Sequence, residues 1–139
     1  MKRFYYESPI AKLVLGLSGC HTITLGPFVF SKRKENDIPQ NIRNHETCHS
    51  FQWIEIACLV GLLVFVLQLT IGIAAWWYLT SAIAFYLWYG IEYMVRLCLY
   101  LDTNKAYKMV SFEQEAYTNE HDANYIENRH MFTGWLKYL

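Results

Sequence analysis

The feature that constrains this chain most is a run of 36 consecutive residues, 56–91, that contains no Asp, Glu, Lys, Arg or His. An uncharged apolar stretch of about 18 residues or more is typical of a membrane-spanning helix. One helix through the whole run would be about 54 Å long, whereas the hydrocarbon core of a bilayer is about 30 Å thick. The run therefore predicts two spans that turn near Gly72, the first within a helix over 38–71 and the second over 73–96.

The charged and aromatic residues indicate how such a hairpin is oriented. All 12 Lys and Arg residues lie outside the uncharged run, seven before it and five after it. Because basic loops stay on the cytoplasmic side of a membrane, we expect both chain termini to face the cytoplasm. Trp53 and Trp88 fit the near interface of the bilayer, and Trp76 and Trp77 fit the far one.

Charge and cysteine content exclude other classes of protein. The 12 acidic residues balance the 12 basic ones, and no basic block is present, which argues against a nucleic-acid partner. The four cysteines show neither a C-x-x-C pair nor a regular spacing. We therefore expect free thiols in a reducing environment. The uncharged run implies membrane lipid as one partner of the chain.

The parts outside the hairpin predict a small β element and one further helix. Segments 12–15 and 22–25 have the composition of paired strands, and 28–30 continues past a kink at Gly26-Pro27. Ser111, with Gln114 three residues later, has the pattern of a capping box and predicts a helix over 111–129.

The predicted fold is mainly α and forms a single domain over residues 1–139. It consists of a β element and loop over 1–37, a transmembrane helical hairpin, and a C-terminal helix that packs on the first long helix.

The sharpest chemical motif is H-E-x-x-H at 45–49. On a helix, His45 and His49 lie on one face, so both imidazoles can reach one zinc ion. Glu46 lies about 100° around the helix, where its carboxylate can take a proton from the water at the metal and pass it to a leaving amine. The alternative is that both histidines are polar residues at the membrane interface and bind no metal.

A catalytic zinc needs a third protein ligand, which we expect from the 111–129 helix. Glu113, Ala116 and Glu120 share one face of that helix, and the small Ala116 would allow a close approach to the first helix. We predict Glu113 as the ligand, with Glu120 as its substitute, and we expect Glu115 to be a solvated charge. By itself, this segment also fits an ordinary charged amphipathic helix.

These motifs resemble a known family. H-E-x-x-H at 45–49, followed by E-x-x-A at 113–116, is similar to the gluzincin type of zinc peptidase, especially its small integral-membrane members. With segments 86–93 and 112–120 added, the chain from about residue 22 onward resembles an uncharacterised family of small bacterial membrane metallopeptidases.

The resemblance implies zinc on His45, His49 and Glu113, and catalysis by Glu46. It also implies a location in the bacterial inner membrane, with the zinc site facing the cytoplasm. In gluzincins a strand before the motif pairs with an extended peptide, and segment 22–30 occupies that place; a capping strand without a ligand is the alternative. The membrane members carry Asp after the Ala of E-x-x-A, where this chain has Tyr117, a possible supporting residue like Glu120.

Glu92 and Arg96 form an i,i+4 pair where the second span leaves the membrane. We favour a structural role for this pair, in which Arg96 extends toward the interface and Glu92 fixes the depth of the helix. Five histidines are too few for the His boxes of membrane di-iron hydroxylases, which excludes that class.

The sequence thus predicts a membrane-bound zinc metallopeptidase that hydrolyses peptide bonds in a peptide or protein substrate. The alternative is a catalytically inactive, metal-binding membrane adaptor or sensor that retains the peptidase frame. Neither the substrate nor the oligomeric state follows from the sequence.

Overall fold

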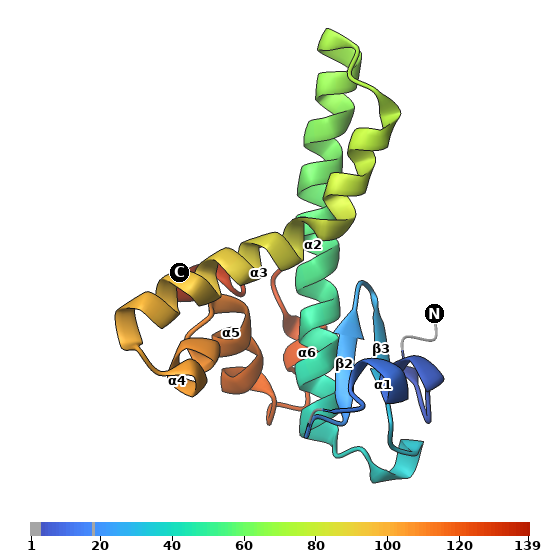
Figure 1. Cartoon of the computed structure of the whole chain (residues 1–139), viewed down its shortest axis with the longest axis vertical. Helices are drawn as coiled ribbons and strands as arrows, with labels where there is room; N and C mark the ends of the chain where they lie inside the picture. The colour runs from blue at the N-terminus through green and yellow to red at the C-terminus, as the bar shows by residue number, and fades with distance from the viewer. Residues whose placement is uncertain (1–3, 18) are drawn as a thin grey trace.

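The computed structural model describes residues 4–17 and 19–139. The fold is mainly helical, with a small sheet and two long apolar helices. A pair of helices rises from a broader body that contains the sheet and the short C-terminal helices (Figure 1).

The longest element is α2, Gln40–Ile71, which carries the H-E-x-x-H motif in its first turns. Pro39 precedes it in extended conformation, and Gly72 ends it in the left-handed region at φ 68°, where a glycine carries no Cβ penalty. The N–H of Gly72 donates to the Gln68 carbonyl at 3.1 Å. The helix predicted over 38–71 thus begins two residues later, at Gln40, and ends before Gly72 as expected.

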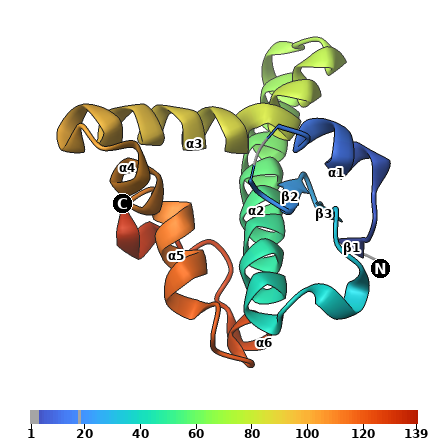
Figure 2. The same ribbon diagram turned by 60° about the horizontal axis from the view of Figure 1, so that its bottom comes forward.

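The second long helix is α3, Leu79–Tyr100, preceded by a 3₁₀ turn over Ala75–Tyr78. It first runs back along α2 and then diverges from it toward the C-terminal helices (Figures 1 and 2). The two helices meet at Gly61 and Ser81, where a Cβ on Gly61 would lie 3.9 Å from that of Ser81, an ordinary van der Waals distance. The predicted second span over 73–96 thus corresponds to a helix that bends away from α2.

Both helices are long and apolar enough to cross a membrane. The apolar windows within Gln40–Ile71 and Ala75–Tyr100 have mean hydropathies of 2.5 and 1.2. Only 17% and 6% of the residues in these windows are buried by the protein itself.

In the described part of the chain, β1 (Phe4–Tyr5), β2 (Thr22–Leu25) and β3 (Phe28–Ser31) form one sheet in the order β1-β3-β2. β2 and β3 pair antiparallel through the two-residue turn Gly26-Pro27, and β1 pairs parallel with β3. β2 is therefore an edge strand, and it lies against α2 (Figure 1).

The prediction of a strand over 12–15 is wrong. Most of this segment belongs to a short helix, α1, Pro9–Val14, and the strand that pairs with β2 is β3. Pro9 follows Ser8 at the first helical position, where its fixed φ favours helix and its missing N–H costs nothing.

The C-terminal part contains α4 (Thr103–Lys108), α5 (Ser111–Asn119), α6 (Tyr125–Asn128) and a 3₁₀ turn over Leu136–Tyr138. The single helix predicted over 111–129 is wrong, because α5 ends at Asn119. The side chain of Asn119 donates to the Glu115 carbonyl at 2.7 Å, and Asn44 donates to the carbonyls of Glu120 and Asp122. The Asn44 amide takes two carbonyls that a longer helix would use for its own backbone.

The predicted capping box at Ser111 is also absent. Glu92 of α3 caps α5 instead: its carboxylate accepts from the Ser111 N–H at 2.8 Å and from the Ser111 hydroxyl at 2.7 Å. A negative charge at a helix N-terminus is favourable. Arg96 donates to Glu92 and to the Tyr138 carbonyl, so this pair joins α3 to α5 and to the C-terminal segment.

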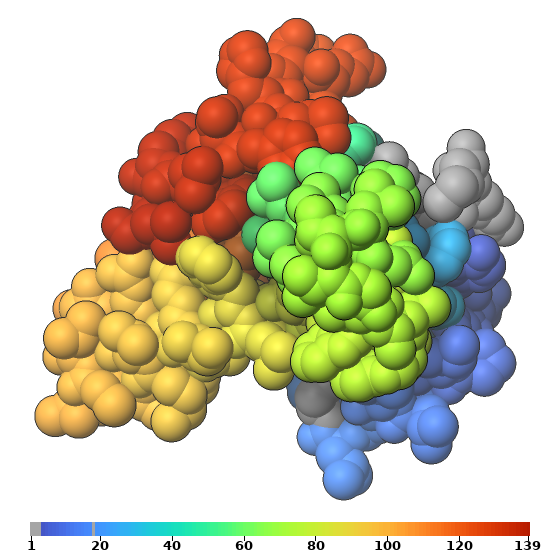
Figure 3. All heavy atoms as spheres, turned by 90° about the horizontal axis from the view of Figure 1, so that it is seen from above, coloured from blue at the N-terminus to red at the C-terminus, as the bar shows by residue number. Residues whose placement is uncertain are grey.

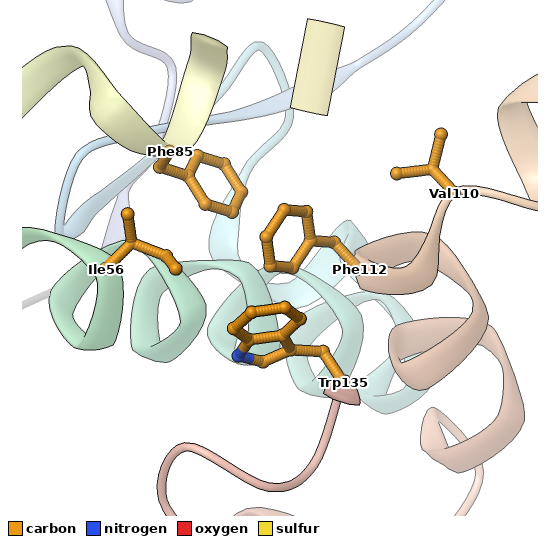
Figure 4. Packing of buried hydrophobic residues seen from close by; sticks show 5 residues of the cluster. All are labelled: Ile56, Phe85, Val110, Phe112 and Trp135. Atoms are coloured by element: carbon orange, nitrogen blue, oxygen red, sulfur yellow. The ribbon is translucent and has the colours of Figure 1, made fainter. Parts of the chain in front are cut away.

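The hydrophobic core lies between α2, α3 and the C-terminal segments. Its buried members are shown in Figure 4: Ile56, Phe85, Val110, Phe112 and Trp135. The Phe112 ring, which is fully buried, lies 4.7 Å from that of Phe85 and 4.9 Å from that of Trp135. Because Phe112 precedes Glu113, this packing fixes the start of α5 beside α2.

Candidate metal centre

His45, His49 and Glu113 converge on one point between α2 and α5. The two Nε2 atoms lie 3.1 Å apart. Glu113 Oε2 lies 3.4 Å from Nε2 of His45, and its Oε1 lies 3.3 Å from Nε2 of His49. The three residues are buried, with exposed fractions of 9% for His45, 8% for His49 and 3% for Glu113. The structure thus brings together the three residues expected from the sequence.

These separations fit a small tetrahedral cation. Zinc–nitrogen and zinc–oxygen bonds of about 2.0–2.1 Å place two ligand atoms of a tetrahedral site about 3.3 Å apart. Among the residues that the structure describes, Glu113 Oε2 is the buried side-chain oxygen without a hydrogen-bond partner. The group can therefore hold a metal ion, and its donor set of two imidazoles and one carboxylate suits a divalent ion such as zinc.

The second nitrogen of each imidazole has its own acceptor. His49 Nδ1 lies 2.8 Å from Gln52 Oε1, and His45 Nδ1 lies 3.2 Å from Glu120 Oε2. A proton on each Nδ1 satisfies both contacts and leaves both Nε2 lone pairs facing each other and the Glu113 carboxylate. Three lone pairs that converge in this way are stabilised by a cation between them.

Glu120 therefore occupies a different place from Glu113. It contacts the outer nitrogen of His45, whereas the inner position belongs to Glu113. Tyr117, which stands where the resembled family has Asp, packs its ring edge-on against the His45 ring at 4.6 Å. Glu120, and not residue 117, thus supplies a carboxylate contact to the outer nitrogen of His45.

A buried polar chain continues outward from His49. The Gln52 amide donates to Glu115 Oε2 at 2.8 Å and to the Phe112 carbonyl at 3.0 Å. Glu115 accepts in turn from Arg129 Nε at 2.6 Å, and Arg129 also pairs with Glu55. The sequence offered no motif for this chain, because its members come from three distant segments.

The expectation that Glu115 is a solvated charge is wrong, since its side chain is fully buried. Burial alone would raise the pKa of Glu115, but the hydrogen bonds from Arg129 and Gln52 outweigh it and lower this pKa. Gly134 is needed for this arrangement, because a Cβ there would lie 2.1 Å from Glu115 Oε1.

Glu113 is held ionised by its surroundings. Burial opposes its charge, yet when the two imidazoles are protonated, the charge of His49 and the hydrogen bonds from His45 and His49 outweigh burial and lower the pKa of Glu113 well below its usual range. Tyr89 of α3 also donates to Glu113 Oε1 at 3.0 Å. Glu113 is therefore fixed from two helices as a carboxylate.

Glu46 lies beside the three converging groups, between α2 and β2. The Thr24 hydroxyl donates to Glu46 Oε2 at 2.5 Å and lies 3.2 Å from the Glu46 carbonyl. Thr24 thus holds this carboxylate at the edge strand, a contact that the sequence did not reveal.

A cleft of about 430 Å³ opens over the centre. His45, Glu46, His49 and Glu113 contribute to its floor, and β2 forms one wall. The other lining residues are mostly apolar or aromatic: Leu15, Ile23, Leu25, Phe85, Tyr86, Tyr89 and Tyr107. Burial and the nearby Glu113 carboxylate raise the pKa of Tyr107, which keeps its phenol protonated. The centre is therefore reachable by a ligand.

In comparisons with protein-family models, curated proteins and solved structures, none matches this chain. The resemblance to gluzincin peptidases therefore rests on the sequence motifs alone, and the structure adds a group of residues that could hold a metal ion.

Proposed function

We propose that this chain is a membrane-bound zinc metallopeptidase that hydrolyses peptide bonds. The observation that carries the proposal is the placement of a positioned carboxylate, Glu46, beside three converging ligands at the floor of an open cleft. A structural zinc site is closed by four protein ligands, whereas a catalytic site keeps one position free. The three protein groups and the cleft favour the catalytic kind.

The roles of the side chains follow from their positions. A zinc ion held by His45, His49 and Glu113 would act as a Lewis acid that lowers the pKa of water and polarises a carbonyl. Glu46 takes the proton of the attacking water on its carboxylate and then delivers it to the leaving amine nitrogen. Thr24 holds Glu46 in the orientation for both transfers.

The edge strand supports binding of an extended peptide. One side of β2 pairs with β3, and the residues of β2 line the cleft. A substrate strand that adds to β2 would gain main-chain hydrogen bonds and lie across the metal ligands. This mode of binding selects extended, flexible peptide.

We also propose that α2 and α3 form a transmembrane hairpin in a bacterial inner membrane. Their apolar windows are barely buried by the protein, and no charged residue occurs between Glu55 and Glu92. The basic residues at both ends of the hairpin favour a cytoplasmic location for the centre.

Glu46→Gln tests the catalytic role. We expect the variant to retain zinc and to lose at least about 10³-fold in peptide hydrolysis, because removal of a general base typically costs 10²–10⁴-fold. Detergent-purified protein is assayed with a fluorogenic peptide library, and its zinc is measured by mass spectrometry. Glu127→Gln, at an exposed position of α6, is the matched control and should behave as wild type.

The same pair of measurements separates the adaptor alternative. If the wild type contains zinc but shows no hydrolysis beyond that of Glu46→Gln, the result would support a non-catalytic metal-binding protein. Absence of zinc even after it is added back would reject both.

A further inference from the structure

The distal part of α3, residues 87–100, presents two different faces. Its inner face contacts the body: Tyr89 donates to Glu113, Glu92 caps α5, and Arg96 donates to the Tyr138 carbonyl. Tyr93 packs against the hydrophobic core. This face therefore packs against the body of the protein.

The outer face is apolar and exposed. Ile91 is 67% exposed and Leu99 is 68% exposed, values typical of residues without protein contacts. Exposed apolar side chains repeat along one stripe of the helix: Leu87, Trp88, Ile91, Met94, Val95, Cys98 and Leu99. Spacings of three and four residues place them on one side of α3. The segment is thus amphipathic, with a buried polar side and an open apolar side.

The direction of this segment distinguishes it from the hairpin. α3 leaves α2 and extends over α4 and α5, so its inner face looks toward the body (Figures 1 and 2). Figure 3, seen from the hairpin end, shows the yellow atoms of this segment on the side from which the hairpin projects. The apolar stripe therefore continues the apolar surface of the hairpin sideways.

We propose that residues 87–100 of α3 lie in the plane of the membrane interface, with the apolar stripe immersed at the boundary of headgroups and acyl chains. This inference rests on the membrane insertion of the hairpin proposed above. It leaves only residues 79–86 of α3 inside the bilayer, about 12 Å of helix, so the hairpin enters the membrane from one side without crossing it. The second half of the straight span is thereby replaced by an in-plane anchor, the mode in which amphipathic helices bind bilayer surfaces.

Three observations favour lipid over a protein partner. The stripe is continuous with a hairpin that carries no charge and is barely buried. Trp88, which is 44% exposed and contacts the buried Trp135 ring edge-on, stands at the margin of the stripe, and tryptophan is enriched at membrane interfaces. Lys105, which lies over the Tyr100 ring at 4.4 Å, follows the end of the helix and suits anionic headgroups.

The in-plane helix links the membrane surface to the metal centre. The same helix that meets lipid with Ile91 holds Glu113 with Tyr89 and caps α5 with Glu92. The cleft, which Phe85 and Tyr86 of α3 also line, therefore lies directly beneath the membrane surface. A substrate bound there would be a polypeptide segment at that surface.

Depth measurements in proteoliposomes test the proposal. The full chain, with Cys20 and Cys58 replaced by Ala, is labelled at one position at a time with an environment-sensitive fluorophore. Vesicles of phosphatidylcholine and phosphatidylglycerol carry bromine at known depths along the acyl chain as quencher. The labelled positions on the stripe are Ile91→Cys, Val95→Cys and the native Cys98; those on the hairpin are Leu62→Cys, Val66→Cys and Leu69→Cys. When any position other than Cys98 is labelled, Cys98 is also replaced by Ala. Circular dichroism of each variant verifies that it folds.

We expect the three stripe labels to share one shallow depth, whereas the hairpin labels deepen along the chain. A spanning helix would separate the labels at 91 and 98 by about 10 Å in depth, and that gradient would overturn the proposal. Quenching of the hairpin labels without quenching of the stripe would also overturn it. If neither the stripe labels nor the hairpin labels are quenched, the proposed membrane insertion of the hairpin itself fails.

Discussion

The two halves of α2, divided at Glu55, differ in how they use their side chains. The first half buries polar groups, and most of these have a partner on a distant segment, such as Glu120 for His45 or Arg129 for Glu55. The second half exposes apolar groups such as Leu63 and Leu69. A buried polar group needs a partner, whereas an exposed apolar surface needs a different solvent. The two halves of one continuous helix are thus suited to two different environments.

The largest expected effect concerns the metal ligands of the first half. His49→Ala and Glu113→Ala should each abolish zinc binding at about micromolar free zinc, because two remaining ligands do not hold a tetrahedral site. Mass spectrometry of purified protein measures the zinc content. Leu63→Ala, in the second half, is the matched control and should keep the wild-type content.

Retention of zinc by Glu113→Ala alone would contradict the assignment of the third ligand. Glu120 would then be the residue to replace next, since it already contacts the outer nitrogen of His45.

The next effect concerns stability. Arg129→Ala leaves Glu55 and Glu115 as buried carboxylates without their cation, and breaking a buried ion pair typically costs about 3–5 kcal/mol in the free energy of unfolding. Denaturant unfolding in detergent, followed by Trp fluorescence, measures this loss. Lys108→Ala removes an exposed cation of α4 and should change the free energy of unfolding by less than about 0.5 kcal/mol. If Arg129→Ala also lost less than about 0.5 kcal/mol, Glu55 and Glu115 would have found other partners.

A smaller effect is expected from the groups that orient the imidazoles. Gln52→Ala and Glu120→Ala remove the acceptors of His49 and His45, and loss of such contacts typically weakens metal affinity about 10- to 100-fold. Competition with a fluorescent zinc chelator measures the affinity. Unchanged affinity in both variants would indicate that packing, as by Tyr117 on His45, orients the rings without these acceptors.

The same division explains what the sequence could predict. The H-E-x-x-H spacing and the uncharged run are local patterns, so the ligand pair, the long helix and its end at Gly72 follow from neighbouring residues. Thr24 and Arg129 carry no local signal, because they contact Glu46 and Glu55, which lie more than 20 residues away. Gln52 contacts His49 within the same helix, but its bond to Glu115 depends on the fold.

Competing contacts explain the errors. α5 ends at Asn119, although the composition of 111–129 suits a helix, and Asn44 of α2 takes the carbonyls of Glu120 and Asp122 beyond this end. In the N-terminal part, Pro9 starts a helix where the apolar residues at 13–15 suggest a strand.

The smallest effect expected is a pH dependence confined to the first half of α2 and its partners. The pKa of Glu115 is lower in the folded protein than its ordinary value, because the hydrogen bonds from Arg129 and Gln52 outweigh burial. The unfolded chain therefore binds more protons than the folded one as the pH falls below about 4.5. The stabilisation by Glu115 is fully present at neutral pH. It decreases as the pH falls from about 4.5, the ordinary pKa of a glutamate, through the lower pKa of Glu115 in the folded protein.

Unfolding of the metal-free protein in detergent, measured between pH 7 and pH 3, should show this decrease in the wild type. Glu115→Gln should be less stable at pH 7 and should lose less on acidification, because it has no proton to gain at this position. Membrane insertion of the hairpin should not change over the same range, since residues 56–91 contain no acidic group or histidine. An equal acid loss in Glu115→Gln would assign the dependence to other carboxylates, and Glu113, whose pKa is also lowered, would be the one to replace.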